Sequence, residues 1–494
     1  MKSDTIELSS LFHPASVAVV GASPNFPKWG SIILHNILRG GYTGKIYPVN
    51  PSAREIFGVT AYPSLQSIPD DVDLVFVVVP PRRVEDVLTD AAGKGVRVAV
   101  IITAGFSETG DDGKRIEESI ATRARTLGVR LVGPNCMGVA SLIPRKLTAW
   151  MPSFIPTDGP VSIVSQSGNV GYSLARALTG RGIGVCRSIS SGNEADLTTS
   201  DFIRALGEDE HTRVILSYVE GVDEGRDFLS ALMDTTPKKP VVILKAGHTD
   251  AGARAGSSHT GAMAGTDELY EAAVLQTGAI RAASLDQLID FTSVLINQPL
   301  PRGKRVGILT LGGGWGVLAA DALEVEGLTV TPLARETISI LDTVLPSWWS
   351  RGNPVDTVAG LREGDLKKCL ETLLSTDYID SLVLCGFGYG TSRGSFLVNS
   401  PYAKMYGMKD FGEKFMTEDE ETAAGIVEMI DRFQKPIIPV VDQGIIEERG
   451  TFVEILRNRG VLLFPSPRRA AASLAALTRY AEHLRERADT DERS

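Results

Sequence analysis

The chain has 494 residues, of which 43% are hydrophobic and 22% charged, a balance typical of a folded globular protein. At about 100–200 residues per domain, this length predicts roughly three domains. The net charge of −10 lacks the basic excess of most nucleic-acid-binding proteins, so we expect no nucleic-acid partner.

The cysteines and the hydropathy indicate the compartment. The four cysteines are Cys136, Cys186, Cys369 and Cys385. They lie far apart and form no CxxC pair, which argues against a structural zinc site or a disulfide framework. The N-terminus has no signal-peptide pattern, and no apolar run approaches the ~18 residues of a membrane span. We therefore expect a cytoplasmic protein that contacts no membrane.

Three segments of the chain open in the same way. Each begins with a short apolar run, passes through a glycine-containing turn and continues into a helical pattern. The turns lie at residues 21–30, 165–168 and 312–316. Strand, glycine turn and helix form the opening of a nucleotide-binding α/β domain, whose ligands bind beyond the carboxyl ends of the strands.

Further apolar runs follow in each segment. They are continuous in Val, Ile and Leu rather than alternating, which is typical of parallel strands covered by helices on both faces. They lie at residues 74–79, 98–103, 214–219, 241–245, 381–385 and 436–441. Helical stretches such as residues 81–94 and 113–128 intervene, and this alternation predicts an α/β fold of doubly wound parallel sheets.

Clusters of proline and glycine mark the domain boundaries. Residues 143–160 separate the first segment from the second, and residues 298–303 separate the second from the third. The expected parts are domains at residues 1–145, 150–298 and 303–480, and a charged tail at residues 481–494. That tail is almost entirely charged from Arg485 onward, so we expect it to be frayed.

The turns of the first segment lie just beyond predicted strand ends. The glycine turn is not a GxGxxG loop; it offers Gly21, Ser23 and then Lys28 ahead of a helix, which suits a phosphate-bearing ligand or forms a plain tight turn. Four further turns lie at residues 47–51, 79–82, 103–108 and 132–138. Because strand ends of an open parallel sheet line one crevice, these turns together favour a ligand site.

The second segment opens with Ser165-Gln166-Ser167-Gly168-Asn169. The hydroxyl and N–H groups of this turn suit an anion such as phosphate. N-capping of the following helix by Ser167 or Asn169 explains the same residues, and the two roles are compatible. Glu220 ends another predicted strand, where it can orient an imidazole or be a solvated loop glutamate.

His259 lies in the small-residue stretch Gly256-Ser257-Ser258-His259-Thr260-Gly261-Ala262. Glycine-rich loops often carry catalytic groups, and an imidazole can act as a base, nucleophile or ligand. A loop histidine without chemistry is the alternative. No second histidine or cysteine lies at metal-ligand spacing, so we expect no metal site here.

Taken in order, these motifs resemble the ADP-forming (NDP-forming) acyl-CoA synthetases, relatives of succinyl-CoA synthetase. The similarity extends from about Leu8 to about Leu477. It rests on the runs Val20-Gly21-Ala22-Ser23, Pro48-Val49-Asn50-Pro51, Gly133-Pro134-Asn135-Cys136, Ser165-Gln166-Ser167-Gly168, Ser258-His259-Thr260-Gly261-Ala262, Gly312-Gly313-Gly314 and Asn353-Pro354-Val355-Asp356. The resemblance implies a CoA-binding Rossmann-like domain followed by two flavodoxin-like, succinyl-CoA synthetase-like parallel-sheet domains.

The resemblance also implies a reaction. A ligase of this type interconverts acyl-CoA, ADP and phosphate with the acid, CoA and ATP, through an acyl phosphate and phospho-His259. Glu220 would support the phosphohistidine. The implied phosphate-binding residues are Ser165, Gln166, Ser167 and Gly168. The implied CoA-binding residues are Gly21, Ala22, Ser23, Lys28, Val49, Asn50, Pro80, Asn135 and Cys136.

The sequence departs from the family pattern in the part that binds the nucleotide. Members of the family need an ATP-grasp domain for ATP or ADP and Mg²⁺, and this sequence reaches a charged tail soon after Arg469. The resemblance therefore implies an α-type chain with a separate ATP-grasp β-type subunit, most simply as α2β2. A second departure is Leu311, where many relatives have Asn, so no role is transferred to the glycines that follow it.

Two other classes of protein remain as alternatives. One is a catalytically incomplete CoA- or acyl-CoA-binding protein with a regulatory or scaffolding role. The presence of His259, Glu220 and the Ser165 turn favours the enzyme, because a pure binder has no need of them. The other is a Rossmann oxidoreductase, which the missing GxGxxG and the missing acidic residue about 20 positions later disfavour. The sequence does not identify the carboxylic acid.

Overall fold

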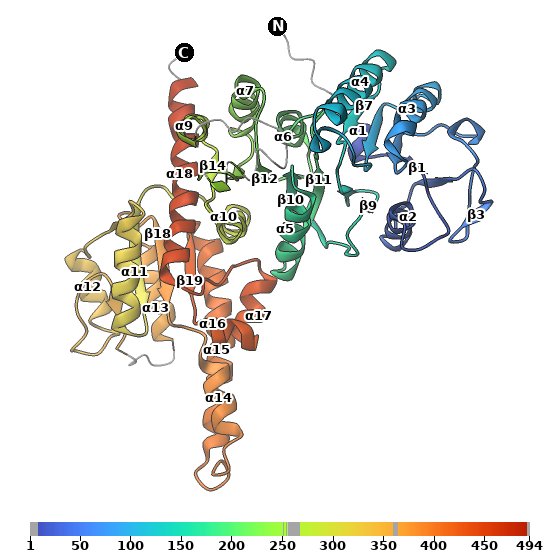
Figure 1. The fold of residues 1–494 in the computed structure, drawn as a ribbon. Helices are drawn as coiled ribbons and strands as arrows, with labels where there is room; N and C mark the ends of the chain where they lie inside the picture. The colour runs from blue at the N-terminus through green and yellow to red at the C-terminus, as the bar shows by residue number, and fades with distance from the viewer. Residues whose placement is uncertain (1–7, 250, 253, 255–266, 359–363, 492–494) are drawn as a thin grey trace. The chain divides into compact units, whose positions relative to one another are not determined.

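The computed structural model describes residues 8–249, 251–252, 254, 267–358 and 364–491. The chain divides into two compact units between Leu288 and Ile289 (Figure 1). No helix in these described ranges is long and apolar enough to span a membrane. The predicted α/β class is confirmed, and each unit is described below by itself.

The first sheet of unit 1 has the strand order β2-β1-β5-β6-β7 and is parallel throughout. Its strands are β1 (Ser16–Val20), β2 (Lys45–Val49), β5 (Leu74–Val77), β6 (Val98–Ile101) and β7 (Arg130–Val132). Alternate residues of β1 enter different cores: Val17 and Val19 pack on one face, Ala18 and Val20 on the other. This two-faced burial is what the continuous apolar runs predict.

Helices and short elements complete this part of the unit. They are α1 (Ser9–Phe12), α2 (Trp29–Arg39), α3 (Val84–Gly93), α4 (Asp111–Leu127), the 3-10 turns η1 (Leu65–Ser67), η2 (Pro81–Arg83) and η3 (Ser107–Thr109), and the hairpin β3 (Glu55–Ile56) with β4 (Val59–Thr60). The helix α4 ends where Gly128 adopts a left-handed conformation (φ 74°), which glycine accepts without a steric penalty.

The second sheet of unit 1 has the order β14-β13-β12-β10-β11-β8-β9. Its elements are β8 (Gly138–Ser141), β9 (Leu147–Trp150), β10 (Asp158–Ser165), β11 (Val185–Ser190), β12 (Val214–Val219), β13 (Val241–Lys245) and β14 (Ile280–Arg281), with α5 (Gly168–Gly180), α6 (Thr199–Glu208), α7 (Gly225–Thr235) and α9 (Asp267–Thr277). β8 joins this sheet antiparallel to β11. Residues 138–141, which the expected boundary at 145 assigns to the first domain, are thus hydrogen-bonded into the second sheet.

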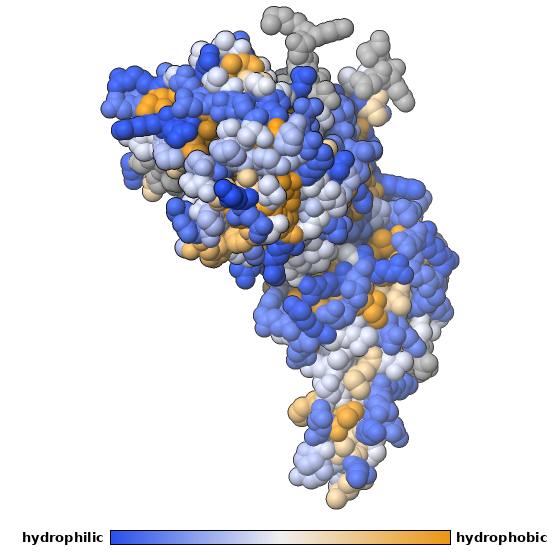
Figure 2. All heavy atoms as spheres, turned by 90° about the vertical axis from the view of Figure 1, so that its right-hand side faces the viewer, coloured by the Kyte–Doolittle hydropathy of each residue, from blue (hydrophilic) through white to orange (hydrophobic). Residues whose placement is uncertain are grey.

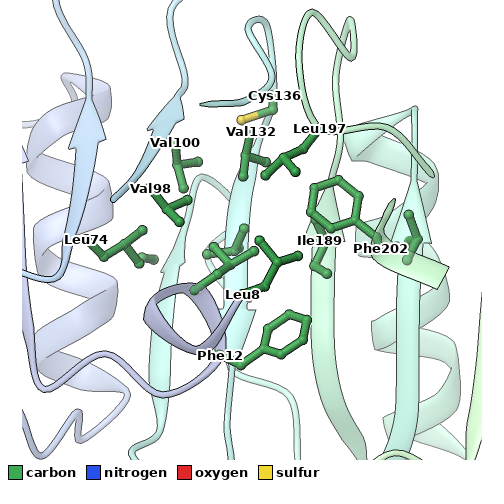
Figure 3. Packing of buried hydrophobic residues seen from close by; sticks show 14 of the residues in the cluster. Leu8, Phe12, Leu74, Val98, Val100, Val132, Cys136, Ile189, Leu197 and Phe202 are labelled. Atoms are coloured by element: carbon green, nitrogen blue, oxygen red, sulfur yellow. The ribbon is translucent and has the colours of Figure 1, made fainter. Parts of the chain in front are cut away.

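The two sheets of unit 1 share one hydrophobic core. Figure 3 shows Leu8 and Phe12 of the N-terminal segment lying between Val98 of the first sheet and Ile189 of the second. The guanidinium of fully buried Arg187 lies 5.3 Å from the Phe12 ring centre and pairs with Asp209 at 3.1 Å. A buried charge is tolerated when it is paired and hydrogen-bonded, so this contact holds the N-terminal segment against the second sheet.

Unit 2 holds a third, parallel sheet with the order β16-β15-β18-β19, and β17 also pairs with β15. The strands are β15 (Arg305–Thr310), β16 (Thr329–Val330), β17 (Val355–Asp356), β18 (Ser381–Cys385) and β19 (Ile437–Val440). The helix α10 (Leu285–Asn297) crosses the boundary between the units. The other helices of unit 2 are α11 (Gly313–Val325), α12 (Arg335–Leu341), α13 (Asp365–Leu374), α14 (Gly390–Val398), α15 (Met408–Phe433), α16 (Gln443–Glu448), α17 (Thr451–Asn458) and α18 (Pro467–Asp491).

Two features of unit 2 differ from expectation. The predicted frayed tail is wrong as far as Asp491, because α18 runs through it. Arg485 donates to the Pro301 carbonyl at 2.8 Å and Glu482 pairs with Lys304, so these charged side chains anchor the helix to the unit. α14 and α15 form a hairpin that projects away from the sheet, with apolar residues at its free end (Figures 1 and 2). Its exposed large hydrophobic side chains are Phe396, Tyr402, Met405, Tyr406 and Phe411.

The cysteines give a test of this fold. All four are buried, and loss of solvation raises the pKa of each thiol to about 12. At pH 8 only roughly one thiol in ten thousand would be a reactive thiolate. We expect a thiol reagent to label none of the four within minutes in the native protein and all four after denaturation. Rapid labelling of the native chain would contradict the packing.

Candidate functional site

The glycine turn after β1 is closed by direct backbone contact. Gly21 has a φ of 95°, and a Cβ there would lie 2.1 Å from the Val78 carbonyl oxygen. A Cβ on Gly30, in the first turn of α2, would lie 2.1 Å from the Gly21 carbonyl oxygen. Only glycine fits at these two positions, so the start of α2 lies directly against the end of β1. A turn of this shape leaves backbone accessible to a large anionic ligand such as CoA.

The other predicted contacts of the first sheet divide into two groups. Asn50 donates to the Ala22 carbonyl at 2.7 Å, and the Ser31 hydroxyl donates to the Ser23 carbonyl at 2.6 Å, so these side chains hold the turn in shape. Ala22, Ser23 and Val49 are buried. Lys28, at the N-terminus of α2, and Pro80, beyond β5, are exposed at the same strand edge. They are the two predicted CoA contacts whose side chains are exposed, while Asn50 is half-buried.

Cys136 does not fit its predicted role. Its side chain is 2% exposed and lies in the core shared by the two sheets (Figure 3). Its thiol donates to the Ile101 carbonyl at 3.4 Å. Cys136 is therefore a packing residue rather than a side-chain contact to CoA. Asn135 beside it has a positive φ of 57° and donates to Asn193 at 3.2 Å.

The predicted phosphate turn joins β10 to α5. The Ser165 hydroxyl donates to the Ser167 carbonyl at 2.6 Å, and a Cβ on Gly168 would lie 2.2 Å from Met137 Cγ. Ser167 occupies the N-cap position of α5 in extended backbone, but its side chain makes no capping hydrogen bond. The N-capping explanation for Ser167 is thus wrong, and its hydroxyl is not committed to the helix.

Gln166 connects this turn to Glu220. Its Nε2 donates to the Gly221 carbonyl at 2.8 Å, and its Oε1 accepts from the backbone N–H of Glu220 at 2.5 Å and of Gly221 at 3.1 Å. Three hydrogen bonds therefore fix the end of β12 beside the phosphate turn. The two predicted site elements are brought together, through a contact that the sequence pattern does not reveal.

His259 lies outside the described residues. The last described strand before it is anchored to Glu220, and the helix after it is anchored to β14. Lys245, the last residue of β13, is buried and donates from Nζ to the Glu220 carbonyl at 2.9 Å. Burial lowers the pKa of this lysine. At the start of α9, Asp267 pairs with Arg281 at 2.7 Å.

Two residues of this site were missed in the sequence. Asn193 and Glu194 follow β11 at the same strand edge as the predicted turns. Glu194 accepts from the hydroxyls of Ser191 at 2.6 Å and Thr199 at 2.5 Å. Loss of solvation raises the pKa of its carboxyl despite these donors. The sequence signal for Asn193 and Glu194 is a pair of polar residues directly beyond a buried strand.

The two sequence motifs of unit 2, the Asn353–Asp356 run and the glycine turn, both have structural explanations. Asn353 donates from Nδ2 to the carbonyls of Val306 and Thr331, both at 2.8 Å, and accepts from the Ile308 N–H at 2.9 Å. This side chain therefore ties β15 to its neighbours. Gly313 lies against the Asp356 carboxylate, 3.0 Å from where its Cβ would be.

Comparison with known proteins assigns the family. Residues 15–141 match a CoA binding domain, and residues 158–295 match a succinyl-CoA ligase like flavodoxin domain. The chain is 36% identical over 486 residues to the acetate–CoA ligase (ADP-forming) I subunit alpha of Pyrococcus furiosus, covering 97% of this chain and 98% of that one. This chain belongs to the ADP-forming acyl-CoA synthetases.

Two further members of this family of acid–thiol ligases are similar over nearly the whole chain. A solved structure of the dinucleotide forming acetyl-coenzyme A synthetase 1 of Ca. Korarchaeum cryptofilum, in complex with phosphate and ADP, has a TM-score of 0.84 at 31% identity. That match covers 97% of this chain and 99% of the other. The 4-hydroxybutyrate–CoA ligase (ADP-forming) of Nitrosopumilus maritimus is 30% identical, covering 97% of this chain and 65% of that longer one.

The tight contact at Gly30 predicts that a larger residue there weakens CoA binding. Gly30→Ala must push α2 away from β1, so we expect the affinity for CoA to fall by roughly tenfold or more, equivalent to about 1.4 kcal/mol. Gly93→Ala, at the end of helix α3, is the matched control, because a Cβ there meets nothing within 4 Å. Calorimetric titration with CoA measures both variants. Equal affinities for Gly30→Ala and the wild type would show that this turn does not bind CoA.

Proposed function

We propose that this chain is the α-type subunit of an ADP-forming acid–CoA ligase, and that His259 carries the phosphoryl group. The observation that carries the proposal is the Gln166 side chain, whose three hydrogen bonds hold Glu220 beside the Ser165–Gly168 turn. A CoA-binding scaffold has no need of a glutamate whose backbone is fixed beside a turn suited to phosphate. No observation among the described residues favours that alternative.

The proposed reaction has three steps. An oxygen of inorganic phosphate attacks the thioester carbonyl of acyl-CoA, and the C–S bond breaks to release CoA and an acyl phosphate. A nitrogen of His259 then attacks phosphorus, and the P–O bond to the acyl group breaks to release the carboxylate. Finally the terminal oxygen of ADP attacks the phosphorus of phospho-His259, which frees the imidazole and forms ATP. Every step is reversible.

The residues of this chain act mainly by positioning. Phosphoryl transfer requires in-line placement and stabilisation of charge more than covalent chemistry by the protein. Ser165, Gln166, Ser167 and Gly168 supply the N–H and hydroxyl groups of the proposed phosphate turn. The Glu220 carboxylate would accept from one imidazole nitrogen of His259, leaving the other nitrogen free to take the phosphoryl group.

We propose that ATP or ADP and Mg²⁺ bind on a separate ATP-grasp subunit, in an α2β2 assembly. Two comparisons support this. The Pyrococcus furiosus relative, which this chain matches from end to end, is named as a subunit alpha. The 4-hydroxybutyrate ligase matches this chain over only 65% of its own length. The two relatives also differ in the acid that they activate, so the substrate of this chain is proposed only as a carboxylic acid.

The first prediction of this proposal concerns phosphorylation of His259. Labelled ATP, supplied with the partner subunit, is expected to label the wild-type chain in an acid-labile form and to leave His259→Ala unlabelled. His248→Ala is the matched control, because this exposed histidine also follows β13. Label that persists in His259→Ala, or that disappears in His248→Ala alone, would refute the role of His259.

The second prediction concerns the need for a partner subunit. The chain alone, given ATP, Mg²⁺, acid and CoA, should form no acyl-CoA and should still bind CoA by calorimetry. Adding an ATP-grasp subunit should restore synthesis. Acyl-CoA formation by the chain alone would contradict the division of labour between subunits.

A further inference from the structure

The loop after β11 lies against the link between the two sheets of unit 1. The backbone N–H of Asn193 donates to the Pro134 carbonyl at 3.0 Å, and that of Ala195 donates to the Gly133 carbonyl at 3.1 Å. A Cβ on Gly192 would lie 2.2 Å from the Pro134 carbonyl oxygen, so the contact is tight. The loop is therefore held at the place where the chain passes from the first sheet to the second.

The side chain of Asn193 joins this loop to the first sheet. Its Nδ2 donates at 2.8 Å to a carboxylate oxygen of Glu108 and at 2.8 Å to one of Glu117. The Ser107 hydroxyl lies 3.0 Å from the same nitrogen, and Oδ1 accepts from Asn135 at 3.2 Å. A flipped amide would direct its oxygen at two carboxylates, so this orientation is fixed. One amide thus contacts both the segment that follows β6 and the turn that follows β7.

Glu108 passes this contact on to the end of β6. Its carboxylate accepts from the backbone N–H of Gly105 at 2.5 Å. A Cβ on Gly105 would lie 3.1 Å from Pro81 Cγ, so this turn packs beside the residue that follows Pro80, a predicted CoA contact. Burial raises the pKa of Glu108, but hydrogen bonds from Gly105 and Asn193 lower it overall, so the carboxylate is charged at neutral pH. This half-buried charge needs the donor that Asn193 supplies.

The same loop contacts the phosphate turn of the second sheet. The backbone N–H of Ser191 donates to the Ser165 carbonyl at 2.9 Å, and both of these residues are fully buried. Met137, in the link between the sheets, packs so closely on this turn that only glycine fits at Gly168. The loop therefore contacts the phosphate turn through its backbone and the first sheet through the Asn193 amide.

Attachment of the loop does not by itself require the Asn193 side chain. The backbone hydrogen bonds to Gly133 and Pro134 form with any residue at position 193 that has an N–H. Asp196 fastens the loop further along, because it accepts from Arg130 Nε and the Leu131 N–H, both at 2.8 Å. What the Asn193 amide adds is a contact with the segment after β6, which fixes the spacing between that segment and the phosphate turn.

We propose that Asn193 is a positioning residue, which sets the distance between the CoA-binding edge of the first sheet and the phosphate turn of the second. This inference rests on the proposed function. It concerns the step in which a phosphate oxygen attacks the thioester carbonyl, the new C–O bond forms, and the C–S bond breaks to release CoA. That step needs both edges at once, whereas phosphoryl transfer between His259 and the nucleotide uses the phosphate turn without the CoA edge.

Two partial reactions test the inference, both with the partner subunit present. The first is the phosphate-dependent exchange of labelled CoA into acyl-CoA, which requires the thioester step alone. Its probe is acetyl-CoA or 4-hydroxybutyryl-CoA, whichever the wild type uses faster. The second is labelling of the chain by ATP, which requires phosphoryl transfer alone.

The expected result is a loss in one partial reaction and not in the other. Misplacement of reacting groups by about 1 Å can lower a rate roughly a hundredfold, so Asn193→Ala should lower the maximal exchange rate between about tenfold and a hundredfold. The rate of labelling by ATP and the acyl-CoA concentration for half-maximal exchange should stay within about threefold of the wild type. Equal losses in both reactions, or a wild-type exchange rate, would overturn the inference.

The contact with Glu117 allows the two partners to be exchanged. Asn193→Asp places a third carboxylate beside Glu108 and Glu117, so like-charge repulsion should make it slower in CoA exchange than Asn193→Ala. Adding Glu117→Gln restores an amide–carboxylate contact and should raise that rate about threefold or more. Glu118→Gln is the matched control, because Glu118 is exposed on the same helix α4. No recovery with Glu117→Gln, or equal recovery with Glu118→Gln, would contradict the proposal.

Two arrangements keep the result clear. If Asn193→Ala does not fold, Asn193→Ser, with its shorter side chain, replaces it and should show the same loss in CoA exchange alone. The role of Asn193 also fails separately from the role of His259. Label that persists on His259→Ala refutes the phosphohistidine, whereas the exchange of CoA does not involve that residue.

Discussion

The rest of unit 1 depends on one constraint, the short link between its two sheets. Only residues 133–137 separate β7 of the first sheet from β8, which is hydrogen-bonded into the second. The loop after β11 is bonded to this link through the carbonyls of Gly133 and Pro134. The carboxyl ends of both sheets are therefore held at one place, and the shared core in Figure 3 keeps them there.

This constraint brings together the two binding turns that we propose for this chain. The first sheet presents the tight turn at Gly21 and Gly30, and the second presents the turn at Ser165 with Glu220 beside it. A phosphoryl acceptor must meet its substrate in a fixed geometry, since catalysis of this kind is largely positioning. The hydrogen-bonded amides of Asn193 and Gln166 provide that rigidity, because each joins loops distant in the sequence.

The sequence predicts the parts that depend on local pattern. Continuous apolar runs identify the buried strands, and glycines such as Gly21 identify turns where backbones touch. It does not predict features that depend on tertiary contact. β8 follows the first sheet in the chain but pairs with β11, and Cys136 points into the core. The charged end of α18 is ordered by contacts such as that of Arg485 with Pro301.

The central claim is that the CoA-binding turns and the phosphate turn of this chain form one continuous site. A crystal structure of the chain with CoA and inorganic phosphate tests it most directly. The account predicts phosphate bound by the N–H groups of the Ser165–Gly168 turn, with the thiol end of CoA reaching that phosphate. Phosphate bound at another place, or a CoA thiol directed away from this turn, would contradict it.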